Sequence, residues 1–283
     1  MIDLQDQMGM ETPRYSFDKE KHIHLLNNIP LYGTTTVLSV IAKPLTWWAS
    51  GLAVKELSGI EDTSIFTKMK NRKATPDEIA NAKDSVKLWL DDHKDMDVDT
   101  YLPLLDKAYR AHSIRLEETA QAGTDLHYEL ERYVKDIIDG STSFLDYDEK
   151  IIPFIRWAST NVKRFLWSEG YCYSEKLWVG GICDVGVELN NGQIGIMDFK
   201  SAKAVYPSHY FQDAGYDILI SENGIHDING KRIYMPDRSF DFYSVVPFGA
   251  KEVIPKFNFD LDGCKNAFIA SLNLYKELQK FQE

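Results

Sequence analysis

Two aspartates and a lysine lie close together in the chain, on either side of one short turn. Asp184 precedes an Asn-Asn-Gly turn at 190–192, and Asp198 and Lys200 follow it. Apolar residues alternate along both flanks of this turn, which predicts a β-hairpin. With a three-residue loop, Asp184 lies directly opposite Asp198. Lys200 then shares the face of Asp198, because side chains alternate along a strand.

This trio could support metal-dependent phosphoryl chemistry. Two neighbouring carboxylates repel each other unless a cation or a proton lies between them. Mg²⁺ is typically held by one or two carboxylates together with water and phosphate oxygens. Lys200 could then stabilise charge that develops on phosphorus, or help orient the attacking water. The alternative is a solvated hairpin face with an incidental ion pair, so other residues must support the metal site.

A helix upstream of the hairpin could bring an imidazole to the same site. Apolar residues recur at helical spacing after Gly123, and Thr124 or Asp125 is expected to cap the N-terminus of this helix. His127 and Glu131 are four residues apart and therefore share a face. A lone histidine on a helix is more often structural, so His127 matters only in combination with the hairpin. The apolar positions are Leu126, Leu130, Val134 and Ile137.

A second helix is predicted to begin near Gln212. Gln212 and Tyr216 are four residues apart and could both face the polar side of the hairpin. There they would offer an amide and a phenol to a phosphate or a sugar.

Taken in order, these motifs resemble the RecB-like branch of the PD-(D/E)XK nuclease superfamily. This branch includes the nuclease domains of bacterial RecB and AddB, many phage exonucleases and the mitochondrial genome maintenance exonuclease. The segments 32–39 and 43–49 are similar to the start of the phage and mitochondrial members. The four motifs are Gly-x-x-x-His at 123–127, Gly-x-x-Asp at 181–184, Asp-x-Lys at 198–200 and Gln-x-x-x-Tyr at 212–216.

The resemblance implies a site made of one imidazole, two carboxylates and a backbone carbonyl, with a catalytic lysine beside them. It implies one or two Mg²⁺ or Mn²⁺ ions as cofactors. The implied metal ligands are His127, Asp184, Asp198 and the carbonyl of Phe199, and the implied catalytic residues are Lys200, Asp198 and Asp184. The supporting acidic residues are Glu131 and Glu175. The implied substrate-binding residues are Gln212, Tyr216, Ser201 and Lys203.

The fold implied by the resemblance is α/β, a restriction-endonuclease-like core with a central mixed β-sheet flanked by helices, plus an N-terminal helical region. We expect an N-terminal hairpin and lead-in over 1–44, a helical region over 45–120 and the nuclease core over 121–283. In related enzymes, the helical region arches over the active site and admits a strand end. That analogy favours an exonuclease that hydrolyses phosphodiester bonds from a DNA end in replication, recombination or repair. Such an enzyme could be encoded by a phage.

Two alternatives remain open. An endonuclease could use the same core, and a DNA-binding or assembly protein could retain a nuclease fold without activity. The expected partner is DNA, either single-stranded or the end of a duplex, with any recombinase or single-strand-binding protein supplied as a separate chain.

Patterns outside the motifs predict further elements. The first of these are an N-terminal hairpin over 15–17 and 22–26, a helix over 151–165 and a strand over 171–179. The later ones are strands over 225–228 and 233–235 joined by a turn at 229–230, a strand over 240–247 and a helix over 264–281.

The net charge of −11, from 43 acidic and 32 basic residues, is unusual for a protein that binds DNA. Phosphate neutralisation dominates nonspecific affinity, so a local basic track is expected. The alternative is that these cations are ordinary solvated side chains. The candidate track consists of Lys68, Lys70, Arg72, Lys73, Lys107, Arg110, Arg115, Lys163 and Arg164.

Three scattered cysteines, Cys172, Cys183 and Cys264, argue against a disulfide scaffold and against a paired-cysteine zinc site. Some RecB-like nucleases hold an iron–sulfur cluster with four cysteines, so we expect no cluster here. The chain has no apolar run of about eighteen residues and no charged-then-apolar leader. We therefore expect no membrane partner and a cytoplasmic location, the host cytoplasm if the protein is phage-encoded.

Overall fold

The computed structural model describes residues 14–42, 46–141 and 147–281, without the side chains of Trp47, Ala120 and Ala122. The chain divides into two compact units. The sheet unit comprises Met1–Ala42 and Gly123–Glu283, and the helical unit comprises Lys43–Ala122.

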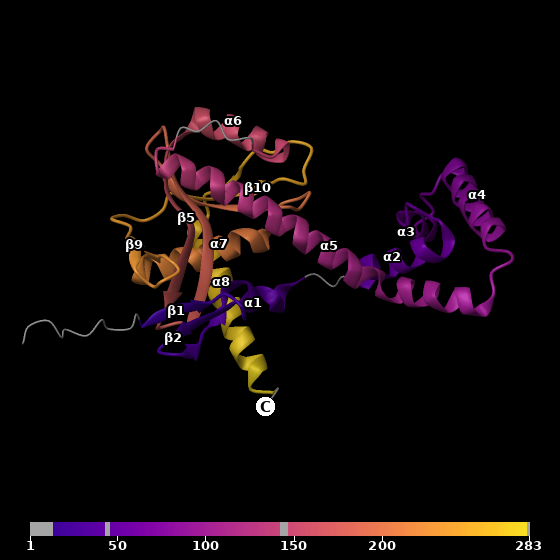
Figure 1. Ribbon diagram of the computed structural model, residues 1–283, viewed down its shortest axis with the longest axis horizontal. Helices are drawn as coiled ribbons and strands as arrows, with labels where there is room; N and C mark the ends of the chain where they lie inside the picture. Colours follow the sequence, from indigo (N-terminus) through magenta and orange to yellow (C-terminus); the bar gives the residue numbers. More distant parts are fainter. Residues whose placement is uncertain (1–13, 43–45, 142–146, 282–283) are drawn as a thin grey trace, which may run out of the picture. The chain divides into compact units, whose positions relative to one another are not determined.

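A mixed β-sheet forms the centre of the sheet unit (Figure 1). In the described residues its strand order is β11-β10-β7-β6-β5-β8-β9, with β4 paired to β6. Strand β6 is antiparallel to both of its neighbours β5 and β7, whereas β10 is parallel to β7. The strands are β4 (Tyr32–Gly33), β5 (Val162–Ser174), β6 (Val179–Leu189), β7 (Ile194–Lys200), β8 (Ile225–His226), β9 (Arg232–Tyr234), β10 (Phe242–Pro247) and β11 (Lys256–Asn258).

A smaller antiparallel sheet precedes this one and consists of β1 (Tyr15–Asp18), β2 (Ile23–Leu26) and β3 (Ile29–Pro30). It confirms the predicted N-terminal hairpin. The segment that follows does not stay separate from the core, because Tyr32 of β4 pairs with Val179 of β6.

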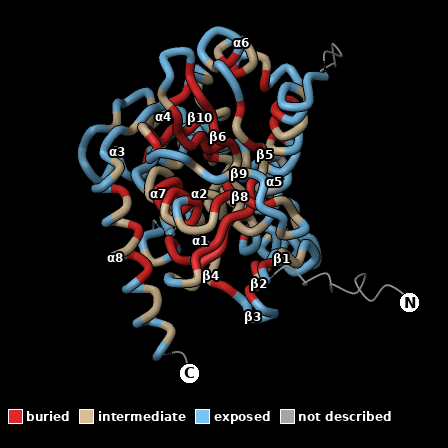
Figure 2. The backbone as a smooth tube through the Cα atoms, turned by 90° about the vertical axis from the view of Figure 1, so that its left-hand side faces the viewer, coloured by how far each residue is buried: buried red, intermediate tan, exposed pale blue. Residues whose placement is uncertain are grey.

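Helices cover both faces of the central sheet. On one face, Leu130 of α5 (Val98–Ile138) and Phe154 of α6 (Ile152–Asn161) pack with Met197 of β7. On the other face, Tyr216 of α7 (Pro207–Asn223) packs in the same cluster as Ile196 of β7. Figure 2 shows how buried residues gather along β6, β10 and α7. Helices α1 (Thr34–Val37) and α8 (Leu261–Gln279) and the short helices η1 (Leu38–Ile41) and η2 (Glu149–Ile151) complete the unit.

The predicted register of the hairpin is confirmed. Val185 pairs with Met197, and the amide of Leu189 donates to the carbonyl of Gln193 at 2.8 Å. Counting outward from these pairs brings Asp184 opposite Asp198. Gly192 adopts a φ of 84° in the turn, a conformation that a residue without a Cβ reaches at low cost.

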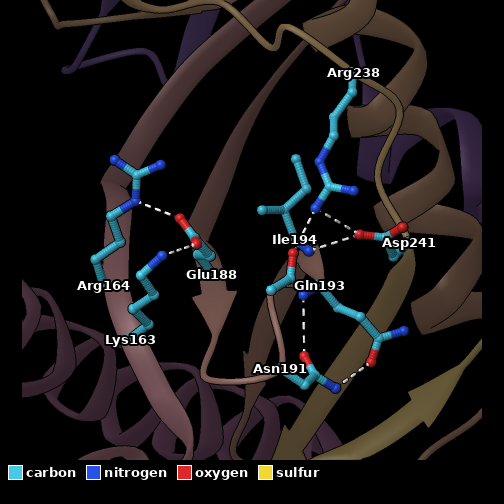
Figure 3. Close-up of polar contacts among 9 residues, drawn as sticks. Lys163, Arg164, Glu188, Asn191, Gln193, Ile194, Arg238 and Asp241 are labelled. Carbon is cyan, nitrogen blue, oxygen red and sulfur yellow. Dashed lines mark hydrogen bonds and ion pairs between the residues drawn. The ribbon is translucent and has the colours of Figure 1, made fainter.

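Polar side chains at the turn end hold this register in place (Figure 3). The carboxylate of Asp241 accepts a hydrogen bond from the amide of Ile194 at 2.8 Å, and Asn191 Oδ1 accepts from the amide of Gln193 at 3.0 Å. Arg238 donates to the carbonyl of Gly192. The turn is therefore tied to the segment that leads into β10.

Several predicted elements differ from the structure. Thr124 and Asp125 lie inside α5 and not at its start, because the helix already begins at Val98. The helix expected over 151–165 ends at Asn161, and β5 begins at the next residue. The strand expected over 171–179 is interrupted by a turn at 175–178. Leu126, Leu130 and Val134 are buried as predicted, whereas Ile137 is 50% exposed.

The later predictions agree more closely with the structure. The amide of Gly230 donates to the carbonyl of Asp227, which closes the predicted turn between β8 and β9. Strand β10 lies within the predicted 240–247, and α8 covers most of the predicted 264–281.

The helical unit contains α2 (Thr46–Ser58), α3 (Ser64–Lys70), α4 (Pro76–Asp92) and the first part of α5. Helix α4 begins with a capping box, in which Thr75 and Glu78 satisfy each other's amides. Among the described residues, no helix combines the length and the apolar character needed to cross a membrane.

Candidate functional site

His127 and Asp184 meet at one edge of the hairpin. His127 Nδ1 lies 3.6 Å from Asp184 Oδ2, which also accepts a hydrogen bond from the amide of Phe199 at 2.7 Å. The apolar face of α5, which includes Leu126 and Leu130, packs on the sheet and so positions the imidazole. The helix and the two strands therefore converge at the place where the sequence motifs suggested a site.

The strand β6 changes faces at Asp184. Cys183 packs on the side of α7, whereas Val185, two residues further on, packs on the side of α5. Regular alternation would place both on one face. Here the Asp184 carboxylate accepts the amide of Phe199, which is a departure from the regular ladder. Alternation along the hairpin predicts one apolar face and one charged face, but the structure has buried apolar residues on both faces, so that expectation is wrong.

Asp198 and Lys200 form the second half of the cluster. Lys200 Nζ lies 2.8 Å from each carboxylate oxygen of Asp198 and donates a hydrogen bond to Oδ1. Gln212 Oε1 accepts from Lys200 at 3.3 Å, while Gln212 Nε2 donates to Asp198 at 3.3 Å and to the Tyr216 hydroxyl at 2.8 Å. Gln212 thus holds the Asp198 carboxylate and the Lys200 ammonium in a fixed arrangement.

Burial dominates the electrostatics of this pair. It raises the pKa of Asp198 to about 6; the Lys200 ammonium opposes this rise and the Asp184 carboxylate adds to it. Burial alone would lower the pKa of Lys200, but the neighbouring carboxylates of Asp198 and Asp184 outweigh it and raise the pKa. Lys200 therefore stays charged at neutral pH, and a cation beside Asp198 would displace a proton at mildly acidic pH.

Tyr216 and Gln212 do not form an open surface for DNA. Tyr216 is 3% exposed and Gln212 is 9% exposed, so the structure places them beneath Asp198 and not along a path on the surface. Ser201 is exposed, and its Oγ lies 3.6 Å from where a Cβ would stand at Gly123 of α5. Lys203 is also exposed and makes no hydrogen bond or ion pair that involves the described side chains.

Glu169 takes the place that the sequence suggested for Glu175. In β5, Ser168 pairs with Val185 and Gly170 with Cys183, so Glu169 stands across from Asp184. Burial, followed by the carboxylates of Glu131 and Asp184, raises the pKa of Glu169 to about 7.

Glu175 instead lies in the turn after β5. There it forms an ion pair with Arg14 at 3.1 Å, and its amide donates to Glu222. Val179, which pairs with Ser174, is five residues from Asp184, or about 16 Å along a strand. Glu131, the other expected supporting acid, forms an ion pair with Lys135. Only the β5–β6 register distinguishes Glu169 from Glu175, and no local motif reveals it.

Asp213 is a second acidic residue that the motifs missed. It is fully buried, and neither of its carboxylate oxygens has a hydrogen-bond partner in the described part of the chain. Burial, and then the charge of Asp198, raises its pKa well above the usual range. Its place directly after Gln212 was visible in the sequence, but the helix face that it occupies was not.

The donor set is chemically suited to a hard or borderline divalent cation, since it offers an imidazole nitrogen and carboxylate oxygens. Asp198 Oδ2 is buried and lies beside the Lys200 ammonium, but it accepts no hydrogen bond from the described residues. Within the same residues, no three His, Cys, Asp or Glu side chains stand ready to hold one ion in their present rotamers. Asp184 Oδ2 accepts from the amide of Phe199 and Asp198 Oδ1 accepts from Lys200, so each carboxylate already uses one of its oxygens. The three cysteines are buried free thiols.

Most cations of the expected basic track are neutralised by acidic neighbours. Lys163 and Arg164 both pair with Glu188 (Figure 3). The described side chains leave Lys70, Arg72 and Lys73 outside any ion pair. The remaining pairs are Lys68 with Asp62 and Glu78, Lys107 with Glu56, Arg110 with Asp106, and Arg115 with Glu118.

Compared with models of known protein families, the chain matches none, and no curated protein matches it either.

Proposed function

We propose that the protein is a divalent-metal-dependent nuclease that hydrolyses phosphodiester bonds from a DNA end. The fold we propose for its sheet unit is the restriction-endonuclease-like core of the PD-(D/E)XK superfamily. One observation carries the proposal. His127 from α5 lies 3.6 Å from Asp184 of β6, and the buried Asp198–Lys200 pair lies on the neighbouring strand β7.

His127, Asp184, Asp198 and the carbonyl of Phe199 would hold Mg²⁺ or Mn²⁺. When bound, such an ion lowers the pKa of water and neutralises the leaving oxygen. The ligand set must lose its protons to bind a cation. Asp198, with a pKa of about 6, is largely ionised at neutral pH and meets this requirement.

The residues around the ligands have separate tasks in this proposal. Lys200 supplies a fixed positive charge for the scissile phosphate, since its ammonium is held by Asp198 and Gln212. Tyr216 fixes the amide of Gln212 from below. Glu169 carries a pKa of about 7, so it exchanges a proton near neutral pH beside His127 and Asp184.

An end-labelled linear DNA tests the nuclease assignment. With Mn²⁺ or Mg²⁺, the wild-type chain is expected to release labelled nucleotides, whereas Asp198→Asn is expected to release none. Asp237→Asn is the matched control, because this residue is an exposed aspartate of the same unit without a hydrogen bond or ion pair to described side chains. Normal release by Asp198→Asn would reject the proposed site.

A covalently closed single-stranded circle separates the exonuclease from the endonuclease alternative, because only an endonuclease can cut it. We expect the circle to survive under conditions in which the linear strand is digested. Persistent DNA binding without cleavage in either metal would favour the non-catalytic alternative.

A further inference from the structure

A cavity of about 770 Å³ lies between α2 and α3 of the helical unit. Its volume is within the range of small-molecule sites. Gly51 lets α2 approach Thr63 closely at this cavity, because a Cβ at this position would meet Thr63 Oγ1 at 2.7 Å. The lining residues are Trp48, Ser50, Gly51, Val54, Thr63, Ser64, Phe66, Thr67, Lys70 and Asn71.

Two aromatic rings of the cavity are open to solvent. Trp48 is 39% exposed and Phe66 is 47% exposed, so neither side chain is fully buried in the core of the unit. Hydroxyl groups and the amide of Asn71 surround them. Flat apolar faces with polar groups at their margin suit a planar heterocycle, which stacks on a ring and hydrogen-bonds at its edge.

The charge beside the cavity is positive in an otherwise acidic chain. Residues 63–76 contain four lysines and arginines and no acidic residue, while the whole chain has a net charge of −11. Lys68 is neutralised by Asp62 and Glu78. Lys70, Arg72 and Lys73 have no ion pair with the described residues, so they remain available to an anion.

The turn that carries these cations is structurally fixed. Arg72 has a φ of 54°, and the amide of Lys73 donates to the carbonyl of Lys68 at 2.8 Å, which closes the end of α3. Lys70 also lines the cavity itself. Lys70 therefore lines the cavity together with the rings, and Arg72 and Lys73 follow it in the turn at the end of α3.

We propose that this cavity binds single-stranded DNA, with a base stacked on Trp48 and Phe66 and the adjoining phosphates held by Lys70, Arg72 and Lys73. This inference rests on the proposed function for its choice of DNA as the partner. Alternating bases and phosphates explain the combination of exposed rings and unpaired cations, whereas an apolar peptide would leave the cations unused. This surface would bind the strand and would take no part in its cleavage.

Fluorescence anisotropy with the full chain in EDTA tests the stacking. The probes are a labelled twelve-nucleotide oligothymidine and an abasic strand of the same length. Trp48→Leu with Phe66→Leu keeps the side chains apolar but removes both rings, and should raise the Kd for oligothymidine by about tenfold while the abasic strand is unaffected. Tyr109→Leu, which removes a ring that is 81% exposed elsewhere in this unit, should change neither.

The cations give a second readout. Replacing Lys70, Arg72 and Lys73 by Gln should weaken binding of both strands and reduce the logarithmic salt slope by about 2. The matched control replaces Lys83, Lys87 and Lys94 of the same unit, which should leave the slope nearly unchanged. Thermal melting followed by circular dichroism verifies that every variant is folded. Phe66→Tyr, which keeps an aromatic ring, should bind oligothymidine as the wild type does.

Binding in EDTA separates this inference from the proposed function. One outcome is that the wild-type chain releases no nucleotides with Mn²⁺ while its DNA binding depends on the two rings. That outcome supports the inference and contradicts the nuclease assignment. The opposite outcome is that the chain digests DNA and binds it equally well without the two rings. That outcome contradicts the inference and supports the nuclease assignment. Unchanged oligothymidine binding in the folded ring variant, or an equal loss for the abasic strand, would also overturn it.

Discussion

The Lys200 ammonium compensates the negative charge of the buried Asp198 carboxylate in the candidate site. Asp198 is 1% exposed, and Lys200 is its direct cationic partner at 2.8 Å. Removing one partner of a buried ion pair leaves the other charge uncompensated. The same cation is the group that we propose for stabilising the phosphate.

Lys200→Met is expected to lower the initial rate of Mn²⁺-dependent nucleotide release by at least about 100-fold, because the charge that stabilises the phosphate is lost. Lys200→Arg keeps the charge but changes its geometry, and should retain more activity. Circular dichroism shows whether both variants are folded. A folded Lys200→Met chain with the wild-type rate would exclude a catalytic role for this residue.

Glu169 gives the site a pH-dependent stability in the metal-free protein. Its pKa rises from 4.5 to about 7 on folding, so the folded state binds this proton more tightly than the unfolded chain. The stabilisation is fully present below about pH 4.5 and is lost as the pH rises through 7. Glu169→Gln should therefore be more stable than wild type above pH 7, by about 1 kcal/mol after a discount for partial solvent exposure.

Urea unfolding in EDTA at pH 5 to 8 measures this difference. The free energies of unfolding of wild type and Glu169→Gln should approach each other toward pH 5. A difference that stays constant over the whole range would show that Glu169 does not take up its proton in the folded state.

The sequence identified some residues of the cluster but not others. The spacing around the turn was enough to pair Asp184 with Asp198 and to place Lys200 beside them, because a tight turn determines the register. Glu169 and Asp213 could not be found in this way. Their positions depend on the β5–β6 register and on the orientation of α7, which are set by packing between distant segments.

At the scale of elements, the close contact between β6 and α7 controls the alignment of the site. A Cβ at Gly181 would lie 2.6 Å from Cε1 of Tyr216 and 2.7 Å from Thr34 Oγ1. These distances are shorter than ordinary contacts, so any side chain here displaces α7 or α1. Tyr216 in turn holds Gln212 beside Asp198 and Lys200.

Gly181→Ala is expected to cost about 1–3 kcal/mol of stability and to reduce nuclease activity more than stability alone explains. Gly192→Ala is the matched control. It should cost about 1–2 kcal/mol because its φ is 84°, yet its Cβ meets nothing within 4 Å and lies at the turn end of the hairpin. Equal activity of the two variants at 20 °C would contradict the proposed coupling.

Element prediction succeeded where the local signal was strong. The Asn-Asn-Gly turn and the turn at 229–230 were found from residue types alone. The start of α5 was missed, because Thr124 and Asp125 resemble a cap while the helix continues through them from Val98. The change of faces at Asp184 was missed because no local pattern marks the place where the carboxylate of Asp184 accepts the amide of Phe199 from the neighbouring strand.

At the scale of the whole molecule, the net charge of −11 should oppose DNA binding unless a divalent cation offsets the acidic site. We expect Ca²⁺, relative to EDTA, to lower the Kd for a linear duplex by about tenfold. Asp198→Asn should reduce this gain because a ligand charge is lost. Anisotropy titrations measure both effects, and an equal Kd in Ca²⁺ and EDTA would contradict them.

The α/β class and the mixed sheet flanked by helices agree with the fold that the resemblance of the ordered motifs implied. The incorporation of Tyr32 into the main sheet was not, because β4 is only two residues long and pairs with a strand almost 150 residues away. Such long-range pairing leaves no periodic trace in the sequence.

The most direct test of the proposed metal site is an anomalous difference map from crystals of the wild-type protein soaked in Mn²⁺. We predict a peak within bonding distance of His127, Asp184 and Asp198, with Lys200 beside it, and no such peak in Asp198→Asn. Manganese that binds elsewhere, or the absence of a peak at these three residues, would contradict the proposal.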